Sequence, residues 1–316
     1  MPSSTLINST NVRNHLGALL QRVELALATR LDRAKAVEIA TRLFSTPPRF
    51  AHTSRELELL STGTRYTVDS RHGEIAAWRF GNPRRDAVIL VHGWGGRGAQ
   101  LGDFVPALVG AGYQVVLFDH AGHGASEGSR ASIVHFWQGL EAVVARAERE
   151  GTRIAGFIGH SLGAASIAAW LNETRRETRA VLVSPPTSVE RYSGYFARQA
   201  GIAEPVRRAM QERLEQQLGR RWSEFELPQS VAHARAAALV IHDRGDREVS
   251  FGSGLKLARA WKNARLVATD GLGHNRILRD PDVVQDAVDF IANRVVFAPP
   301  PAKGESSPYA APAAIA

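Results

Sequence analysis

A serine between glycines stands where a predicted strand meets a predicted helix, a position that could expose a nucleophile. The residues Gly159-His160-Ser161-Leu162-Gly163 follow the apolar run 153–157 and precede the helix-like segment 164–171. A Gly-x-Ser-x-Gly pattern is typical of a tight turn that presents the serine hydroxyl at the end of a strand. Glycines suit such a turn because they lack the Cβ that would keep strand and helix apart. The pattern is short and also fits an ordinary loop, so the rest of the chain decides its interpretation.

A serine hydroxyl becomes a good nucleophile only when a base removes its proton and a carboxylate orients that base. Both residue types follow the serine, each just after a predicted strand. His274 follows the run 265–268, is the only histidine beyond His242, and is expected to begin the final helix. We expect it to act as general base and then as general acid. Asp246 follows the run 237–241, and we favour it as the orienting carboxylate.

Two other acidic residues compete with Asp246 for that role. Asp243 lies directly at the predicted strand end, where a carboxylate can hydrogen-bond the loop itself. Glu248 lies two residues beyond Asp246 and is the weaker competitor. Asp246 is preferred because it follows Gly245 and is far enough from the strand end to reach the histidine.

Acyl transfer also needs backbone N–H groups that stabilise the negative charge on the carbonyl oxygen. We expect one from Leu162, which follows the nucleophile at the N-terminus of a helix. The second is expected from Trp94, in the glycine-rich loop 92–98 after the apolar run 87–91. Such a loop could instead cradle phosphate, but the chain lacks the dinucleotide fingerprint and the Lys-Ser/Thr pair of a phosphate-binding loop.

A second turn, at residues 119–126, holds side chains that could ligate a metal ion. These are Asp119, His120 and His123. No further cluster of ligands accompanies them in the sequence. We therefore interpret the segment as a structured turn beside the site and expect neither a metal nor a cofactor.

Apolar runs of strand length alternate with helix-like segments from residue 87 onward. Strands that are apolar on both sides and alternate with helices predict a mostly parallel, doubly wound α/β sheet, with its site at the carboxyl ends of the strands. An antiparallel pair at 66–68 and 74–80, with a turn at 69–73, is expected before them. The remaining strand-like runs are 87–91, 114–118, 154–158, 180–183, 237–241 and 265–268, and the helix-like segments are 100–110, 133–150, 162–173, 254–261 and 281–295.

Three segments lie outside this alternation. Residues 11–44 have the spacing of amphipathic helices and end at Thr46-Pro47-Pro48. Some fifty residues without a strand-like run follow Val183, including a helix that starts near Pro205, and they indicate a cap or lid. The expected organisation is a helical extension at 1–60, an α/β core at 61–186 and 237–297, a helical cap at 187–236 and a disordered tail at 298–316.

The composition excludes several classes of function. The net charge is +8, with 35 arginines and 4 lysines, but the basic residues are scattered, so we expect no nucleic-acid partner. The absence of cysteine excludes disulfides and thiolate chemistry. The early apolar stretch 16–31 is interrupted by charges and resembles neither a signal peptide nor a membrane span. A cytoplasmic protein is the expectation.

Taken together, these motifs closely resemble the α/β-hydrolase family over about residues 64–295. The resemblance implies an eight-stranded sheet whose second strand is antiparallel, a cap after the sixth strand and catalysis without a cofactor. It also implies that Trp94 and Leu162 supply the oxyanion amides. Serine at 161 separates the chain from haloalkane dehalogenases and epoxide hydrolases, which carry aspartate there. The matching segments are 92–96, 119–126, 159–163, 243–249 and 273–274.

The expected activity is that of a serine hydrolase that cleaves small-molecule carboxylic esters through an acyl-enzyme. Aromatic residues at 192, 195 and 196 suggest a small to medium acyl group. Thioesterases, amidases, acyltransferases and C–C hydrolases use the same triad on this fold, so they remain alternatives. A non-catalytic ligand-binding protein on the same fold is the alternative from another class. The N-terminal helices could pack on the core, cover its entrance or join two copies as a homodimer.

Overall fold

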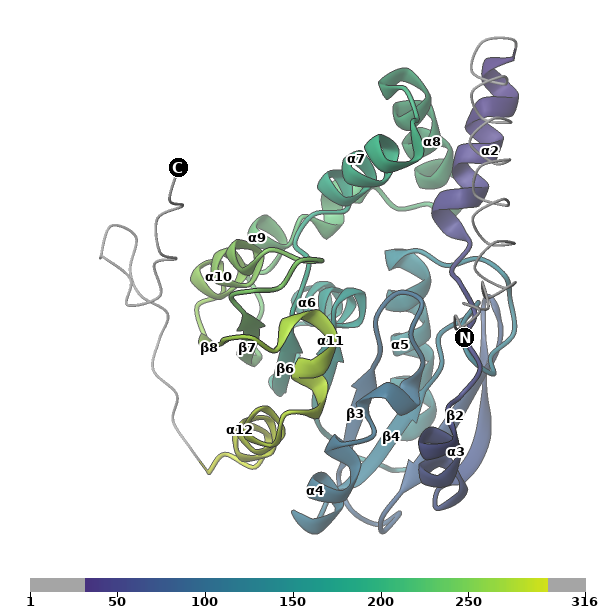
Figure 1. Cartoon of the computed structure of the whole chain (residues 1–316). Helices are drawn as coiled ribbons and strands as arrows, with labels where there is room; N and C mark the ends of the chain where they lie inside the picture. The colour runs from purple at the N-terminus through teal and green to yellow at the C-terminus, as the bar shows by residue number, and fades with distance from the viewer. Residues whose placement is uncertain (1–31, 295–316) are drawn as a thin grey trace, which may run out of the picture. The chain divides into compact units, whose positions relative to one another are not determined.

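Eight strands pair into one sheet in the computed structural model, which describes residues 32–294 (Figure 1). The order across the sheet is β1-β2-β4-β3-β5-β6-β7-β8. Strand β2 runs antiparallel to both of its neighbours, whereas β3 to β8 are parallel. The strands are β1 (Thr64–Ser70), β2 (Gly73–Phe80), β3 (Ala87–Val91), β4 (Gln114–Phe118), β5 (Ile154–His160), β6 (Arg179–Val183), β7 (Ala237–Asp243) and β8 (Ala264–Thr269).

The helices follow the alternation expected from the sequence, with local differences at their ends. They are α2 (Arg33–Ser45), α3 (Ser54–Ser61), α4 (Phe104–Gly110), α5 (Ile133–Arg149), α6 (Leu162–Thr174), α7 (Val189–Ala200), α8 (Glu204–Leu218), α9 (Leu227–Ser230), α10 (Phe251–Ala260), α11 (Gly273–Arg276) and α12 (Pro281–Ile291). Short 3₁₀ turns are η1 (Gly98–Leu101), η2 (Trp222–Phe225) and η3 (Ile277–Arg279). None of these helices is long and apolar enough to cross a bilayer.

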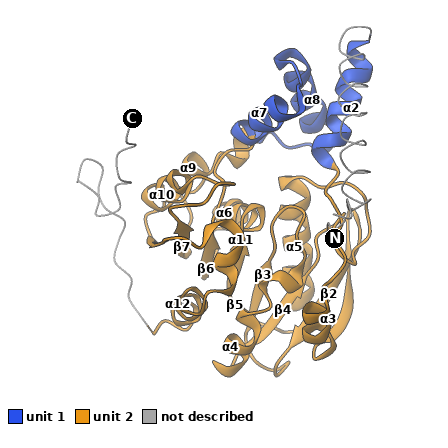
Figure 2. Cartoon of the chain, viewed as in Figure 1, with its two compact units in different colours: residues 1–45, 190–222 blue, residues 46–189, 223–316 orange. Residues whose placement is uncertain are grey.

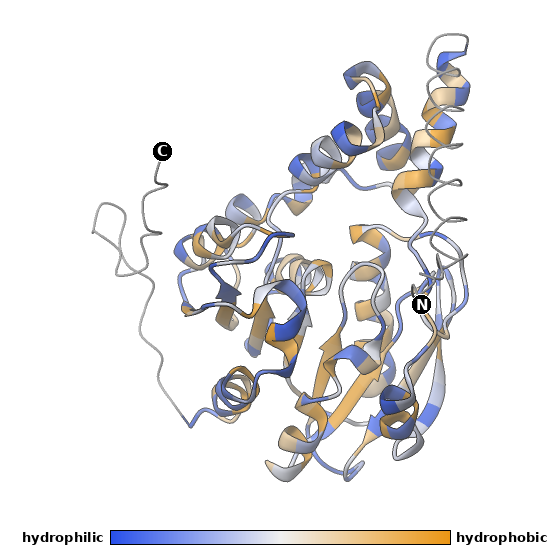
Figure 3. Ribbon diagram, in the orientation of Figure 1, coloured by the Kyte–Doolittle hydropathy of each residue, from blue (hydrophilic) through white to orange (hydrophobic). Residues whose placement is uncertain are grey.

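The two faces of the sheet bury different sets of side chains. Successive residues of a strand point to opposite faces. In β5, Ile158 joins an apolar cluster with residues of α4 and α12, whereas its neighbour Phe157 packs against Trp170 of α6, with ring centroids 5.5 Å apart. Every residue of β3 and β4 is buried, and Figure 3 shows both strands as mostly hydrophobic. Helices on both faces explain why these strands carry continuous apolar runs rather than an alternating pattern.

Three local predictions are corrected by the structure. The antiparallel ladder extends to the pair Ser70 and Gly73, so the predicted turn at 69–73 shrinks to two residues. The helix expected at 100–110 is divided into η1 and α4. His274 does not begin the final helix but lies in the separate short helix α11. The helix α12 begins separately because Asp280 acts as its N-cap and accepts hydrogen bonds from the N–H groups of Asp282 and Val283. Pro281 is the first helical residue, a position that suits proline.

Contacts divide the chain into two compact units (Figure 2). Among the described residues, the helical unit comprises 32–45 and 190–222, and the sheet unit comprises 46–189 and 223–294. These divisions differ from the expected boundaries, because α2 packs with α8 whereas α3 and α9 belong to the sheet unit. A lid function of the cap stays a prediction. The amphipathic stretch before residue 32 and the predicted tail lie outside the described residues.

An aromatic cluster explains why α2 joins the helical unit. The ring of Phe44 lies 5.9 Å from Tyr192, 5.2 Å from Phe196 and 5.4 Å from Trp222 between centroids. Phe44 is buried at the end of α2, so these contacts remove its ring from water. An amphipathic helix is stabilised mainly by burial of its apolar face. For α2 that burial comes from Tyr192, Phe196 and Trp222, which lie far along the chain.

Replacing Leu90 with alanine tests the buried position of β3. Leu90 is fully buried, so we expect Leu90→Ala to lower the free energy of unfolding by about 2–5 kcal/mol. The matched control is Leu57→Ala, because Leu57 on α3 is 56% exposed and its loss should cost less than about 0.5 kcal/mol. Urea denaturation of both variants measures the difference, and equal losses would contradict the burial of β3.

Candidate active site

The predicted site residues follow strands whose carboxyl ends lie at one edge of the sheet. Gly159 of β5 pairs in register with Val91 of β3, and His160 pairs with Val183 of β6. Val183 pairs in turn with Ile241 of β7. Because these strands are parallel, the loops that carry Trp94, Ser161, Asp246 and His274 leave the same edge of the sheet.

Ser161 occupies a strained turn between β5 and α6. Its backbone angles are φ 52° and ψ −123°, which a residue with a side chain rarely adopts. The turn is held by a 2.9 Å hydrogen bond from Ser161 N–H to the carbonyl of Val183. The neighbouring glycines are sterically required, because a Cβ on Gly163 would meet the carbonyl oxygens of Val91 and His92. The sequence therefore folds here as the predicted strand-to-helix elbow.

Asp246 and His274 are in direct contact. Oδ2 of Asp246 lies 2.7 Å from Nδ1 of His274, and both side chains are buried. The other oxygen of Asp246 accepts hydrogen bonds of 2.9 Å from the backbone N–H groups of Glu248 and Val249. Burial alone would raise the pKa of Asp246, but hydrogen bonds from His242 and His274 outweigh it and hold that pKa well below its usual range.

The two competing carboxylates have other partners. Asp243 accepts hydrogen bonds of 2.9 Å from Gly245 N–H, from the hydroxyl of Thr269 and from Leu272 N–H. It thereby joins the loop after β7 to the loop after β8, as a carboxylate at the strand end was expected to do. Glu248 is exposed, and its Oε2 lies 4.0 Å from Nε2 of His274.

His160, the residue before the serine, contacts the histidine of the site and was not singled out from the sequence. Its Nε2–H donates a 2.9 Å hydrogen bond to the carbonyl of His274, and the ring centroids are 4.6 Å apart. Burial lowers the pKa of His160 to about 3, so the ring is neutral. The contact brings the loop of His274 beside the serine turn. Within residues 32–294, no hydrogen bond joins the hydroxyl of Ser161 to His274, and such bonds commonly tighten only when substrate binds.

Two N–H groups beside the serine are free of partners. The N–H of Trp94 donates no hydrogen bond to any described residue, although Gly95 N–H, Gly96 N–H and Gly98 N–H in the same loop all do. The N–H of Leu162 opens α6, where a helix has no internal acceptor to offer. The N–H of Trp94 is therefore an available donor in the loop after β3, at the position expected for an oxyanion donor.

A buried ion pair anchors that loop to α3. Nη2 of Arg97 lies 2.6 Å from Oε2 of Glu56, and Nε of Arg97 donates a 2.8 Å hydrogen bond to the same oxygen. Glu56 also forms a capping box with Thr53 at the start of α3. Burial opposes ionisation of Glu56, but the hydrogen bonds from Thr53 and Arg97 lower its pKa overall.

The turn at 119–126 supports the same loop. Asp119 accepts hydrogen bonds from Gly98 N–H at 2.7 Å and from Ala125 N–H at 2.8 Å. Nε2 of His123 accepts from Gly95 N–H at 3.1 Å. The ring nitrogens of His120 form no hydrogen bond to this loop; its ring stacks on that of Phe136, with centroids 3.8 Å apart. No group of three or more potential ligands in the described part of the chain is arranged to hold a metal ion.

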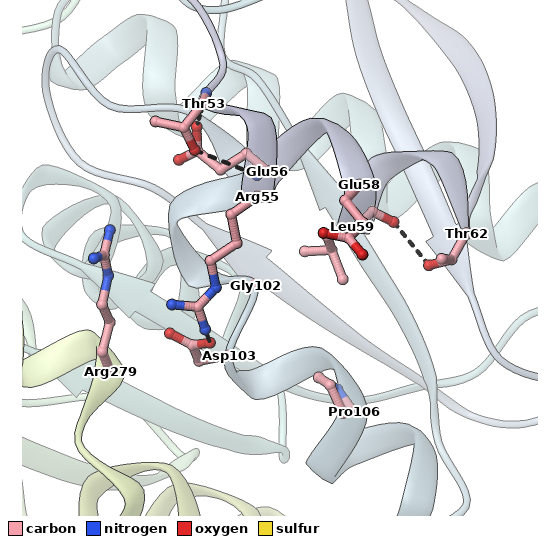
Figure 4. Close-up of a pocket in the computed structure, with 10 residues that line it drawn as sticks. All are labelled: Thr53, Arg55, Glu56, Glu58, Leu59, Thr62, Gly102, Asp103, Pro106 and Arg279. Atoms are coloured by element: carbon pink, nitrogen blue, oxygen red, sulfur yellow. Dashed lines mark hydrogen bonds and ion pairs between the residues drawn. The ribbon is translucent and has the colours of Figure 1, made fainter.

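A pocket of about 270 Å³ lies elsewhere in the sheet unit, between α3 and the start of α4 (Figure 4). Arg55 reaches across it to form an ion pair with Asp103. None of the predicted site residues lines this pocket. Its lining is a mixture of opposite charges and apolar groups that includes Arg55, Glu58, Leu59, Asp103, Pro106 and Arg279.

The sheet order and the serine elbow define a protein of the α/β-hydrolase class. A family model described as "Serine aminopeptidase, S33" matches residues 82–265, which is more than half of the chain. The chain therefore belongs to this family of α/β hydrolases.

Individual relatives agree with this class. A pyrethroid hydrolase of Sphingobium wenxiniae is 36% identical over 99 residues, which cover 30% of this chain and 34%, about a third, of that protein. An uncharacterised protein of Mycobacterium tuberculosis is 29% identical over 250 residues, covering 75% of this chain and 79% of that protein. The structure of a Pyrococcus furiosus esterase superposes with a TM-score of 0.60 at 19% identity, over 78% of this chain and 98% of that one. The eight-stranded fold expected from the sequence is thus confirmed.

Stability should depend on pH through the buried histidines. Burial lowers the pKa of His123 to about 4, and that of His135 and His160 to about 3, from an ordinary value of 6.5. These rings stay neutral in the folded chain while the unfolded chain takes up protons below about pH 6.5, so the free energy of unfolding should fall as the pH is lowered from about 7 to about 3.

Denaturant midpoints across this pH range measure the effect. His135→Gln should make the dependence shallower because it removes one buried ring, whereas His233→Gln, at an exposed position, should leave it unchanged. A midpoint that is independent of pH would contradict the burial of these rings in neutral form.

Proposed function

We propose that this protein is a serine hydrolase that cleaves carboxylic esters through an acyl-enzyme, with Ser161, His274 and Asp246 as its catalytic triad. The observation that carries the proposal is the 2.7 Å contact between Asp246 and His274 at the sheet edge that bears the strained serine turn. A buried carboxylate on Nδ1 fixes the histidine tautomer in which Nε2 can accept a proton.

The proposed reaction has two halves. In the first, Nε2 of His274 takes the proton of Ser161 while Oγ forms a bond to the carbonyl carbon of the ester. The carbonyl oxygen becomes negative and accepts hydrogen bonds from the N–H groups of Trp94 and Leu162. The tetrahedral intermediate then expels the alcohol, which receives the proton from His274. In the second half, His274 takes a proton from water, the water oxygen attacks the acyl carbon, and Ser161 leaves with its proton restored.

The choice of an ester is supported by the names of similar proteins and by the chemistry of the site. A hydrolase of pyrethroids and an esterase are among the similar proteins, whereas the family description names an aminopeptidase and so favours amide substrates as the second candidate. Esters need less help with the leaving group than amides do, because an alkoxide is expelled more readily than an amine anion. We propose an ester of small to medium acyl chain, as expected from the sequence.

A fluorophosphonate probe tests whether the serine is activated. Wild-type protein should be labelled, and Ser161→Ala should lose both labelling and hydrolysis of p-nitrophenyl esters. Ser223→Ala, at an exposed serine, is the control and should behave as wild type. Parallel assays with esters of increasing chain length, thioesters and amino-acid amides identify the bond that is cleaved. Labelling that persists in Ser161→Ala would assign the reactive nucleophile to another residue and exclude this triad. Absence of labelling from the wild type would exclude the proposal in favour of a binding protein.

Replacing each aspartate in turn tests the assignment of the acid. Asp246→Asn should lower kcat by roughly three to four orders of magnitude, because the amide favours the wrong tautomer of His274. Asp243→Asn should cost about 1–3 kcal/mol of stability through lost hydrogen bonds, with a loss of kcat of about tenfold or less. Steady-state kinetics and urea denaturation separate the two effects. A larger kcat loss in Asp243→Asn than in Asp246→Asn would reverse the assignment.

A further inference from the structure

A second histidine contacts the carboxylate of Asp246. His242, the penultimate residue of β7, is completely buried, and its Nε2 lies 3.4 Å from Oδ2 of Asp246. That oxygen is the one that receives Nδ1 of His274. Asp246 Oδ2 therefore lies between two imidazole rings, and only one of them has a part in the proposed reaction.

The surroundings of His242 fix its tautomer. Nε2 also lies 2.9 Å from the carbonyl oxygen of Val249, which can only accept, so Nε2 carries the hydrogen. Among residues 32–294, Nδ1 is buried with no hydrogen-bonding partner, so the fold offers an acceptor only to Nε2. Gly254 makes room for the ring, because a Cβ there would lie 2.5 Å from Nδ1. The Nε2–H group is thus turned towards Val249 and Asp246 by the fold itself.

This arrangement immobilises both oxygens of the carboxylate. Oδ1 is held by two backbone N–H groups at 2.9 Å. Oδ2 accepts a full hydrogen bond from His274. It also lies near the Nε2–H group of His242, which donates its hydrogen bond to the carbonyl of Val249. A distance of 3.4 Å is longer than an ordinary hydrogen bond, so the contribution is mainly electrostatic and orientational. Rotation of the carboxylate would lose all of these contacts together.

We infer that His242 is a positioning residue of the proposed triad, whose Nε2–H holds Asp246 ionised and directed at Nδ1 of His274. The inference rests on the proposed function. It differs from a packing role, because it acts through Asp246 and depends on the donor rather than on the volume of the ring.

The chain offers a matched control for the loss of a buried histidine. His120 is also completely buried, and neither of its ring nitrogens has a hydrogen-bonding partner in the described part of the chain. His120→Leu should therefore remove a ring of the same size without removing a hydrogen bond. His242→Leu removes the donor, and His242→Gln keeps an N–H group near the place of Nε2.

A double-mutant cycle with Asp246 measures the coupling. His242→Leu should lower kcat for a p-nitrophenyl ester by about tenfold, equivalent to about 1.4 kcal/mol, with KM unchanged within about twofold. His242→Gln should recover most of that loss, and the denaturation midpoint of His120→Leu shows what the loss of a buried histidine ring alone costs in stability. In the Asp246→Asn background, His242→Leu should have no further effect, because its target is already gone. An equal loss in both backgrounds would overturn the inference.

A spectroscopic measurement separates this inference from the proposed activity. The Nδ1 proton of His274, hydrogen-bonded to Asp246, should give a downfield proton resonance that is absent in Asp246→Asn. We expect His242→Leu to shift that resonance or speed its exchange with water, and His242→Gln to preserve it. Far-UV circular dichroism and denaturation midpoints confirm that each variant is folded. An unchanged resonance in folded His242→Leu overturns the inference whether or not the protein hydrolyses esters, whereas unlabelled Ser161 overturns only the proposed function.

Discussion

The close approach of β3, β5 and α6 around Ser161 is the constraint on which the site depends. The backbone of Ser161 is held at a positive φ, and its N–H is fixed to β6 through Val183. Gly163 has no room for a Cβ against the carbonyls that end β3. This turn costs free energy locally, and the buried parallel strands on both sides offset that cost. The serine, the first turn of α6 and the loop after β3 are therefore placed by one packing arrangement.

The other half of the site is organised by carboxylates rather than by strain. Asp243 joins the loops after β7 and β8 through Thr269 and Leu272, and Asp246 then contacts His274 from within that framework. Two aspartates three residues apart thus have separate tasks. One sets the distance between two loops, and the other orients an imidazole. His160 connects this framework to the serine turn through the carbonyl of His274.

The sequence predicted the features that local pattern controls. The apolar runs located the strands, and the residues after them located the candidate site, since strand ends in a parallel sheet converge. Three other features depend on contacts that local pattern does not encode. Phe44 contacts Tyr192 and Trp222, which lie 148 and 178 residues further along the chain. The environment of His242 is set by Val249 and Gly254, whose relation to it exists only after folding. The break before α12 required the cap at Asp280 to be recognised.

The ion pair between Arg97 and Glu56 shows that the candidate site depends on residues outside the segment that matches the family model. Residues 82–265 contain Ser161 and Asp246 but omit both Glu56 and His274. A fragment trimmed to those limits would lack the proposed base, and it would also leave the guanidinium of Arg97, 7% exposed, without its counterion. An uncompensated buried charge is costly, and here it would fall in the loop that carries Trp94. The segment from Thr53 onward is thus as much a part of the candidate site as the strands that define the family.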